Sequence, residues 1–349
     1  MDRKRPTPEG DGRMHMEGTS NTVSYGRGKK TLVHLSICPW LFVHARSSIA
    51  LWCCSFLVLV CAPAFASLDT LERQVHEDLK KLNIPGKQWT RHPACFCGPP
   101  PLDVAIIGSG MAGNTVALAL AKEGIVNIRI FDANPEGNEG SWNTYARMKQ
   151  LRSNKRLAGP SAGIPSLTFR AWYLATRGHG AWEVLGFIPT GTWGDYLRWY
   201  RKVLRLPVAN EVTLKKITPH NGWLELTVEE GAATKTYLAR KVVLATGMEG
   251  FGGNVIPPYM SDVPKNFYAT AYEPIAPACL KEKRIAVIGA GASAFDATAF
   301  ALENGAHRVD MMVRRKKIPL TDKLSQFSDR GIQHGFYSLS DDIRCRFFA

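Results

Sequence analysis

Short apolar runs rich in β-branched residues alternate with helical patterns along the chain from about residue 100. The runs Asp103–Ile107 and Arg284–Ile288 are typical of strands buried inside a parallel sheet. Each is followed by a glycine-rich turn, a helix-forming segment and a second apolar strand, which ends at Asp132 in one case and just before Arg314 in the other. This strand–turn–helix–strand order occurs twice and predicts an α/β fold with two parallel sheets.

Between these two units the hydrophobic period changes from helical to alternating. Residues 192–204 predict a helix with Trp193, Leu197, Tyr200 and Leu204 on one face, and such a face favours core packing over contact with a cofactor. Further on, alternation predicts a small β-meander of short strands, with turns at 220–222 and 230–231. The predicted strands are 211–218, 223–229, 235–239 and 240–247.

The first hundred residues divide into three parts. Residues 1–30 are polar, basic and glycine-rich, which predicts disorder. The uncharged apolar segment 47–68 is long enough to span a bilayer and ends in a signal-peptidase-like A-x-A at Ala64–Ala66. It begins too late for an ordinary signal peptide, so a misplaced start, an uncleaved anchor and a non-functional region all stay open. Ser67 then predicts the N-cap of an amphipathic helix that ends at Pro85-Gly86.

Composition narrows the possible partners of the chain. Its 349 residues are 45% hydrophobic and 21% charged, which suits a globular protein with two domains. The formal net charge is +14, but no helix-turn-helix, zinc-finger or aromatic-basic motif accompanies it. Part of the basic excess lies near the N-terminus and another part in the run 314–317, and we interpret it as solvated charge and a phosphate site, with no nucleic-acid partner.

The eight cysteines predict neither a metal site nor a disulfide framework. Cys95 and Cys97 form a C-x-C without a second pair at zinc-ligand spacing. No C-x-x-C lies inside either glycine-rich unit, which disfavours a disulfide-reductase chemistry. The sequence also offers no triad or metal cluster, so it identifies no catalytic side chain.

The first glycine-rich unit has the full context of a dinucleotide site. Gly108 permits a tight turn, Gly110 lets a pyrophosphate approach the backbone, and Gly113 lets the helix pack on the strand. The N-terminus of that helix offers free N–H groups to the phosphates. Asp132 follows the second strand, where a carboxylate accepts hydrogen bonds from ribose hydroxyls. This pattern predicts FAD, bound by the loop residues Gly108, Ser109, Gly110, Met111, Ala112 and Gly113 together with Asp132.

The second unit differs at two places. Ala294 stands where the third glycine would be, and the acid after the second strand is replaced by Arg314 and Arg315. Arginines there suit the 2′-phosphate of NADPH, which an acid would repel. The predicted NADPH-binding residues are Gly289, Gly291, Ala292, Ser293, Arg314 and Arg315. A chain that holds both cofactors is suited to passing a hydride from one to the other.

Other candidates come from the loops between the units. Trp142 is a candidate to cover a ring system, and Arg147 and Arg152 are candidates to meet phosphate or substrate anions; a surface loop around one buried tryptophan explains them equally well. The small residues Ala245-Thr246-Gly247, after the last apolar strand of the meander, would let the backbone lie against a bound nucleotide.

From about Leu68 onward the chain resembles the FAD/NAD(P)-binding flavoprotein monooxygenases, a class B-like group with flavin-containing, Baeyer–Villiger and N-hydroxylating members. The resemblance rests on IIGSGMAG, FDANP, GSW, VVLATG and VIGAGASAFD. It implies two doubly wound, Rossmann-like domains, with the NADPH domain inserted in the FAD domain. The expected divisions are an N-terminal extension 1–67, a helix and linker 68–100, an FAD domain 101–282 and an NADPH domain 283–349.

The resemblance implies a cytoplasmic monooxygenase that passes hydride from NADPH to FAD and then oxygen from O2 to a small organic substrate. The chain departs from the family in lacking a histidine in the segment 266–284, and it looks truncated after the second unit. A flavin-dependent reductase or dehydrogenase without oxygen transfer therefore stays open, as does a degenerate nucleotide-binding fragment. Membrane anchoring or export depends on the segment 47–68.

Overall fold

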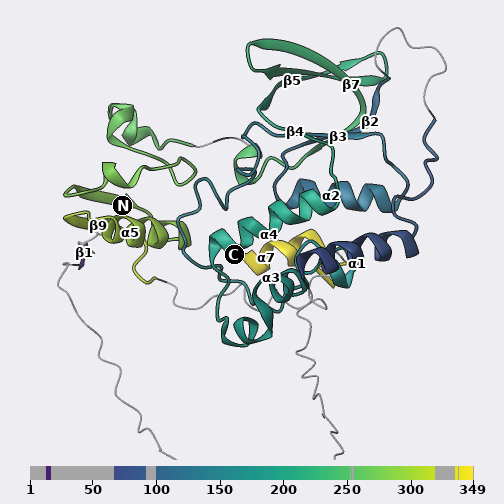
Figure 1. Ribbon diagram of the computed structural model, residues 1–349. Coiled ribbons are helices and arrows are strands. Elements are labelled where there is room, and N and C mark those ends of the chain that lie inside the picture. Colours follow the sequence, from purple (N-terminus) through teal and green to yellow (C-terminus); the bar gives the residue numbers. More distant parts are fainter. Residues whose placement is uncertain are drawn as a thin grey trace, which may run out of the picture. The chain divides into compact units, whose positions relative to one another are not determined.

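The computed structural model of the chain describes residues 13–16, 67–91, 100–251, 253, 255–318, 335–336 and 338–348. Its helices are α1 (Leu68–Lys81), α2 (Met111–Lys122), α3 (Phe169–Val184), α4 (Thr190–Val203), α5 (Ala292–Glu303) and α7 (Asp341–Phe348) (Figure 1). Its strands are β1 (Arg13–Met16), β2 (Leu102–Ile107), β3 (Ile128–Phe131), β4 (Val208–Ala209), β5 (Val212–His220), β6 (Trp223–Glu230), β7 (Ala233–Leu244), β8 (Arg284–Ile288) and β9 (Arg308–Met312).

Helix α1 forms where its sequence predicts it. The hydroxyl of Ser67 accepts a hydrogen bond from the Thr70 N–H at 3.3 Å and so caps the first turn. Asp69 lies in the first turn and lysines lie in the last, which suits the helix dipole. Leu71 and Val75 are buried against the helical core, so the apolar face predicted from the sequence is confirmed.

The larger sheet carries the first glycine-rich unit. Its strand order is β4-β3-β2-β7-β6-β5, in which β4, β3, β2 and β7 run parallel and β6 and β5 run antiparallel. Ile107 pairs with Phe131 on one side and with Leu244 on the other. The ends of β2, β3 and β7 therefore meet at one edge, which is where ligands bind in open parallel sheets.

Strand β7 is longer than the sequence predicted. Residues 235–239 and 240–247 were expected as two strands, and the structure joins them into one strand that ends at Leu244. No glycine or proline interrupts this stretch. Its first half pairs with β6 and its second half with β2, and Ala239 pairs with both. The meander and the parallel sheet are thus one continuous sheet.

A helical layer covers one face of this sheet. Helix α2 lies between the sheet and the other helices, because Ala117 packs on β2 and β3 while Leu118 packs on α1, α3 and α4 (Figure 1). The aromatic face of α4 is core, as predicted: Trp193, Leu197 and Tyr200 are buried. The sequence reading missed α3, whose course bends at Gly178 with φ +81°.

Two tyrosines of α4 predict a stability change at high pH. Burial raises the pKa of Tyr196 and of Tyr200 above the ordinary value, and each hydroxyl donates to a backbone carbonyl at 2.7 Å. Unfolded tyrosines ionise above about pH 10 while the folded ones stay protonated, so the free energy of unfolding falls as pH rises above about 10, by about 1.4 kcal/mol per pH unit and tyrosine.

Urea unfolding at pH 8 to 11 should show that the variant Tyr196→Phe loses about one tyrosine's share of this decline. Equal slopes for wild type and Tyr196→Phe would contradict the prediction.

The second unit forms a smaller sheet with the order β1-β9-β8. Strands β8 and β9 are parallel, and Val309 packs with Ala301 of α5 and with Leu280. Strand β1 pairs antiparallel with β9 and lies within residues 1–30, the segment for which the sequence predicts disorder. The backbone N–H and C=O groups along one side of β9 form the hydrogen bonds that hold this short segment as a strand.

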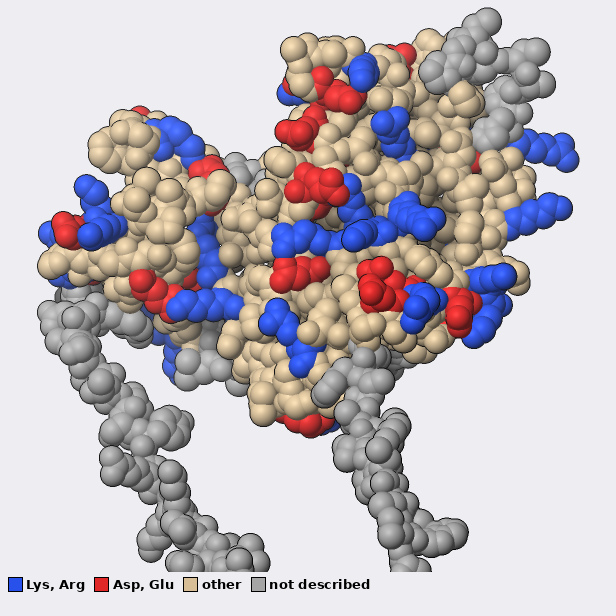
Figure 2. Space-filling model, viewed as in Figure 1, with Lys and Arg blue, Asp and Glu red and all other residues tan. Residues whose placement is uncertain are grey.

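The apolar segment 47–68 lies outside the described residues except at its last two positions. Among the helices that the structure describes, none is long and apolar enough to cross a membrane. The C-x-C of Cys95 and Cys97 also lies outside the described residues. On the face shown in Figure 2, basic side chains are interspersed with acidic ones, an arrangement typical of solvated charge.

Candidate functional site

Two glycines of the first loop are required by the packing of the protein itself. Gly108 has φ +101°, and a Cβ on it would lie 2.4 Å from the carbonyl oxygen of Ala245. A Cβ on Gly113 would lie 1.9 Å from the carbonyl oxygen of Gly108. Neither position accepts a larger residue, so both glycines are explained without any ligand.

Gly110 is different. Its backbone is extended, with φ −68°, and a Cβ on it would meet only the Cα of Gly140, at an ordinary distance of 3.5 Å. The protein would therefore accept alanine at this position. A ligand lying against the backbone supplies the missing reason for glycine, as a pyrophosphate does at this point of the fingerprint.

The N-terminus of α2 is arranged to receive an anion. Gly110 is its N-cap, no side chain caps this end, and its first turn contains no acidic residue. Met111 and Ala112 at the start of the helix are exposed. The positive end of the helix dipole and the N–H donors of the first turn together favour phosphate.

Ser109 and Asn114 lock the loop from inside. The Ser109 hydroxyl donates to Asn114 Oδ1 at 2.9 Å, and Asn114 Nδ2 donates to the Ser109 carbonyl at 3.0 Å. Both residues are buried. The Ser109 side chain thus holds the loop, and Ser109 also lines the adjoining pocket, so its contact with a cofactor stays a prediction. The sequence reading missed Asn114, whose signal is a polar residue within an otherwise apolar helix.

Asp132 lies at the end of β3, beside the glycine loop. Its Oδ2 accepts the Ser109 N–H at 2.6 Å and its Oδ1 accepts the Asn134 N–H at 2.9 Å. A carboxylate oxygen has two lone pairs, so each retains the capacity to accept a ribose hydroxyl. The same side chain therefore shapes the loop and offers acceptors at its predicted position.

The tripeptide Ala245-Thr246-Gly247 follows β7 and reaches the same loop. The Ala245 N–H donates to the Ile107 carbonyl at 2.8 Å, and its carbonyl lies against Gly108. Thr246 and Gly247 are exposed at this edge. The structure thus brings this tripeptide beside the first glycine loop, and its contact with a bound nucleotide stays a prediction.

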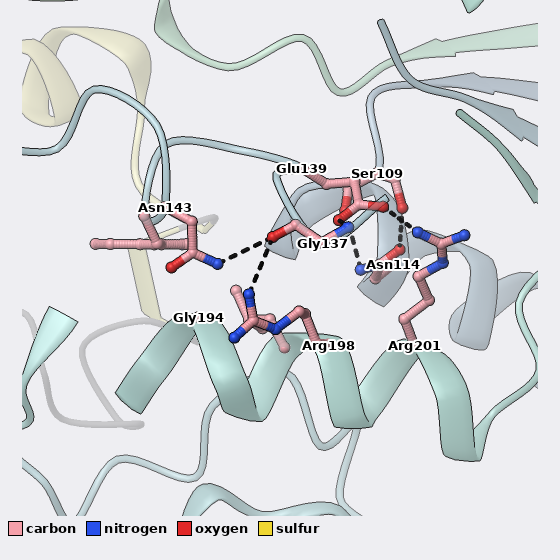
Figure 3. Close-up of a pocket in the computed structure, with 10 residues that line it drawn as sticks. Ser109, Asn114, Gly137, Glu139, Asn143, Gly194, Arg198 and Arg201 are labelled. Carbon is pink, nitrogen blue, oxygen red and sulfur yellow. Dashed lines mark hydrogen bonds and ion pairs between the residues drawn. The ribbon is translucent and has the colours of Figure 1, made fainter. Parts of the chain in front are cut away.

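A pocket opens next to the loop, between three parts of the chain (Figure 3). The Gly137 carbonyl accepts hydrogen bonds from Asn143 Nδ2 at 3.1 Å and from the Arg198 guanidinium at 3.3 Å. The lining residues are Ser109 and Asn114 from the first unit, Gly137, Glu139, Trp142 and Asn143 from the connection after β3, and Gly194, Leu197, Arg198 and Arg201 from α4. The sequence reading missed the contribution of α4.

Trp142 is half-buried at this pocket. Its ring meets Trp193 edge to face, with centroids 6.3 Å apart, so it joins the pocket to the aromatic core. Glycine at position 194 makes room for the neighbouring loop, because a Cβ there would lie 2.3 Å from Asn143 Oδ1. Trp142 is therefore well placed for the ring-covering role that the sequence suggested.

Arg147 and Arg152 make protein contacts in this structure. Arg147 donates to the carbonyls of Ala271 at 2.9 Å, of Glu273 at 2.6 Å and of Thr270 at 3.3 Å. Burial lowers the pKa of its guanidinium, and the nearby Glu273 opposes that shift. Arg152 forms an ion pair with Asp296. Both arginines therefore bind the segment that leads into and through the second unit.

The second glycine loop repeats the register of the first. The Gly289 N–H donates to the Met312 carbonyl at 3.0 Å, as the Gly108 N–H donates to Phe131 at 2.7 Å. The residue that corresponds to Asp132 is therefore Val313, and Arg314 comes one position later. The expectation that the arginines occupy the position of the acid is corrected by one residue, because the strand ends at Met312.

The remaining features of the second loop suit a bound dinucleotide. Gly289 has φ +133°, and a Cβ on it would lie 3.6 Å from the Ala294 side chain, so alanine is accommodated as the third residue of the fingerprint. A Cβ on Gly291 would meet nothing within 4 Å. Ala292, Ser293, Arg314 and Arg315 are all exposed around the start of α5 and the end of β9.

Two family models match the chain. An FAD-NAD(P)-binding family matches residues 105–249, and the L-lysine 6-monooxygenase/L-ornithine 5-monooxygenase family matches residues 187–347. An FAD-dependent urate hydroxylase from Xanthomonas campestris is 41% identical over 289 residues, which are 81% of this chain and 60% of that protein. The chain thus spans less than two thirds of the length of this curated relative.

Solved structures share the fold at low sequence identity. An ornithine hydroxylase from Pseudomonas aeruginosa superposes with a TM-score of 0.58 at 17% identity, covering 70% of this chain and 63% of that one. A cadaverine monooxygenase from Erwinia amylovora, solved with FAD, superposes with a TM-score of 0.54 at 16% identity, over 70% and 60% of the two chains. An ornithine N-hydroxylase from Kutzneria sp. 744 gives a TM-score of 0.53 at 19% identity, over 71% and 62%.

Proposed function

We propose that the chain, which matches FAD-NAD(P)-binding and lysine/ornithine monooxygenase family models and a curated FAD-dependent hydroxylase, is an NADPH-dependent flavin oxidoreductase that oxygenates a small organic substrate. The observation that carries the proposal is that the two glycine-rich loops make the same backbone hydrogen bond to the end of the following strand. Asp132 comes directly after that strand in the first unit, and Arg314 comes two positions after it in the second. Bound FAD would supply hydride acceptance and activation of O2, while the protein positions the reactants.

The first unit supports FAD as its ligand. The packing of the protein does not require glycine at position 110, so the exposed backbone there is explained by the approach of a diphosphate. The N-terminus of α2, which no side chain caps, offers N–H donors to it. Asp132 holds the loop and keeps acceptor capacity for the ribose. Trp142 lines the adjoining pocket. We assign FAD to this site and to the domain 101–282.

The second unit supports NADPH. Its strand end carries an aliphatic side chain at Val313 where the first unit has a carboxylate, so no acid repels a 2′-phosphate there. Arg314 and Arg315 follow at once and are exposed. The β8–α5–β9 unit supports 283–349 as a nucleotide domain, which we place as an insertion in the FAD domain.

The relatives are named for the hydroxylation of urate and ornithine and for the oxygenation of cadaverine. We propose a small organic molecule of this general size, with O2 as co-substrate, and a cytoplasmic location, which suits an NADPH-dependent enzyme. A reductase without oxygen transfer is the second candidate, since residues 266–284 contain no histidine.

The test is a spectrum of the purified chain followed by turnover. We expect a bound-flavin spectrum after incubation with FAD, and NADPH oxidation coupled to O2 uptake when urate or a primary amine is offered. NADPH oxidation with an artificial acceptor, but without substrate-dependent O2 uptake, would favour the reductase. A protein that takes up no FAD would contradict both candidates and indicate a non-catalytic fragment.

A further inference from the structure

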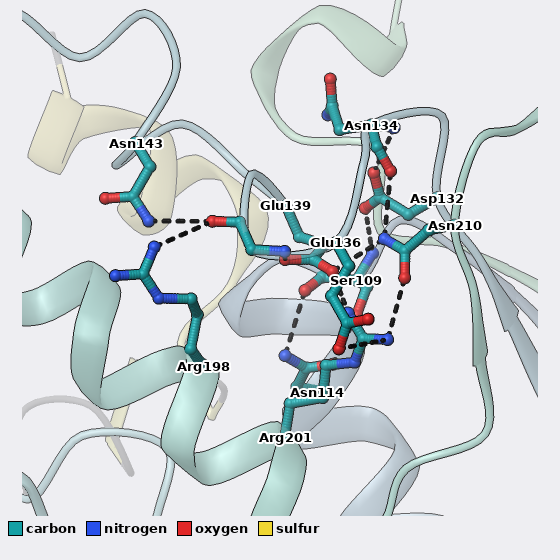
Figure 4. A network of polar contacts seen from close by, with 11 residues as sticks. Ser109, Asn114, Asp132, Asn134, Glu136, Glu139, Asn143, Arg198, Arg201 and Asn210 are labelled. Carbon is teal, nitrogen blue, oxygen red and sulfur yellow. Dashed lines mark hydrogen bonds and ion pairs between the residues drawn. The ribbon is translucent and has the colours of Figure 1, made fainter.

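A largely buried ion pair lies in the wall of the pocket and is not part of either glycine-rich motif. The side chain of Glu139 is 7% exposed and that of Arg201, on α4, is 15% exposed, and the two form an ion pair (Figure 4). The same carboxylate accepts the Gly137 N–H at 2.9 Å and Asn210 Nδ2 at 2.7 Å. One carboxylate thus connects its own loop, α4 and the residue that follows β4.

The contacts continue from this ion pair to the glycine loop. Arg201 also donates to Asn210 Oδ1 at 2.8 Å, and Asn210 Nδ2 donates to the Asn134 carbonyl at 3.0 Å. The Asn134 N–H in turn donates to Asp132, whose second oxygen accepts the Ser109 N–H. Figure 4 shows this continuous line of polar contacts from α4 to the first turn of the dinucleotide site.

The loop that Glu139 holds lies directly on that site. Gly137 and Gly140 have φ of +87° and +73°, so the loop turns sharply on either side of Glu139. A Cβ on Gly140 would lie 3.3 Å from the Cα of Gly110. The backbone of this loop therefore rests against the position at which a diphosphate would approach α2.

The burial of the pair favours a role in placement over a role in stability. Removing two charges from water costs about as much as their attraction returns, so a buried pair is weak evidence for stabilisation. Its specific geometry, in contrast, selects one arrangement of the loop, because the planar guanidinium reaches the carboxylate and an amide oxygen at once.

We propose that Glu139 and Arg201 are positioning residues of the FAD site, which hold residues 134–143 against the first glycine loop. This inference rests on the assignment of FAD to that loop. The two residues act through the backbone of Gly137 and Gly140 and through the Asn210–Asn134–Asp132 contacts.

The test uses the full chain, from which FAD is first removed. FAD is then added back, and its dissociation constant is measured by flavin fluorescence. In the double variant Arg201→Met/Glu139→Gln both charges are replaced by side chains of similar size, so no unpaired charge is left buried. We expect at least about tenfold weaker FAD binding, with the melting temperature of the apoprotein close to that of wild type. The control is Lys235→Met/Glu230→Gln, which removes an exposed ion pair on the β6–β7 hairpin and should leave FAD binding unchanged.

The outcomes separate this inference from the assignment of the cofactor. A double variant that binds FAD within about twofold of wild type overturns the positioning role while the FAD site stands. If the wild-type protein binds no FAD, the proposed function is wrong, and the positioning role falls with it. If the double variant does not fold, Glu139→Gln serves in its place, since it removes the negative charge from the ion pair and keeps the size of the side chain. Unchanged FAD binding in Glu139→Gln would then overturn the inference.

Discussion

Replacing Gly110 by valine is expected to abolish flavin binding while the protein still folds. The extended backbone of Gly110 accepts any L-residue, and its Cβ would make only an ordinary contact with Gly140. The added methyl groups would occupy the space through which a pyrophosphate approaches the backbone. We expect FAD affinity to fall about 100-fold or more, which is ~2.8 kcal/mol, because each tenfold is about 1.4 kcal/mol. Flavin absorbance of the purified variant measures the loss.

Two further variants make this result specific. Gly291→Val changes the corresponding residue of the second unit, whose surroundings are open, and should weaken NADPH binding while the flavin content stays at the wild-type level. Gly113→Ala should instead destabilise the fold, since its Cβ would lie 1.9 Å from the Gly108 carbonyl. If Gly110→Val keeps its yellow colour, the first loop is not the FAD site.

The double variant Arg314→Ala/Arg315→Ala is expected to lose a preference for NADPH over NADH. Both arginines are exposed just beyond β9, beside the residue that corresponds to Asp132. A guanidinium binds a 2′-phosphate through charge-assisted hydrogen bonds of about 1.5–3 kcal/mol each, so even one contact gives about tenfold discrimination or more. The measurement is kcat/KM for NADPH and for NADH in both proteins.

Lys316→Ala/Lys317→Ala is the matched control, because it removes the same charge from the same basic run. It should leave most of the preference in place if the arginines contact the phosphate directly. Equal use of both nucleotides by wild type, or an unchanged preference in the arginine variant, would contradict the assignment and favour a solvated basic turn.

The two nucleotide units could be recognised from sequence because their information is local. Within about thirty residues each unit contains a buried strand, a glycine turn, a helix and a second strand, and the structure places Gly108, Gly110, Gly113 and Asp132 together as expected. The aromatic face of α4 could also be predicted from the sequence, because residues at helical spacing lie on one side of a helix whatever they pack against.

Other features depend on partners that lie far away in the chain. Arg152 was a candidate to meet phosphate or substrate anions, and nothing in the sequence indicated its ion pair with Asp296. The join of the meander to the parallel sheet depends on β7 finding both β6 and β2. The structural contacts of Ser109 could not be predicted from the sequence, because Asn114 and Asp132 together bind its backbone and side chain.

By itself, then, the sequence determined the two glycine-rich strand–turn–helix–strand units and the acid that follows the first of them, because backbone conformation and strand period are local properties. Only the tertiary structure decided that α4 forms a wall of the pocket, that Glu139 meets Arg201 and that Val313 takes the place of the acid. Those facts depend on how helices pack on a sheet and where paired strands end, and side-chain packing between distant segments leaves no periodic signal in a single sequence.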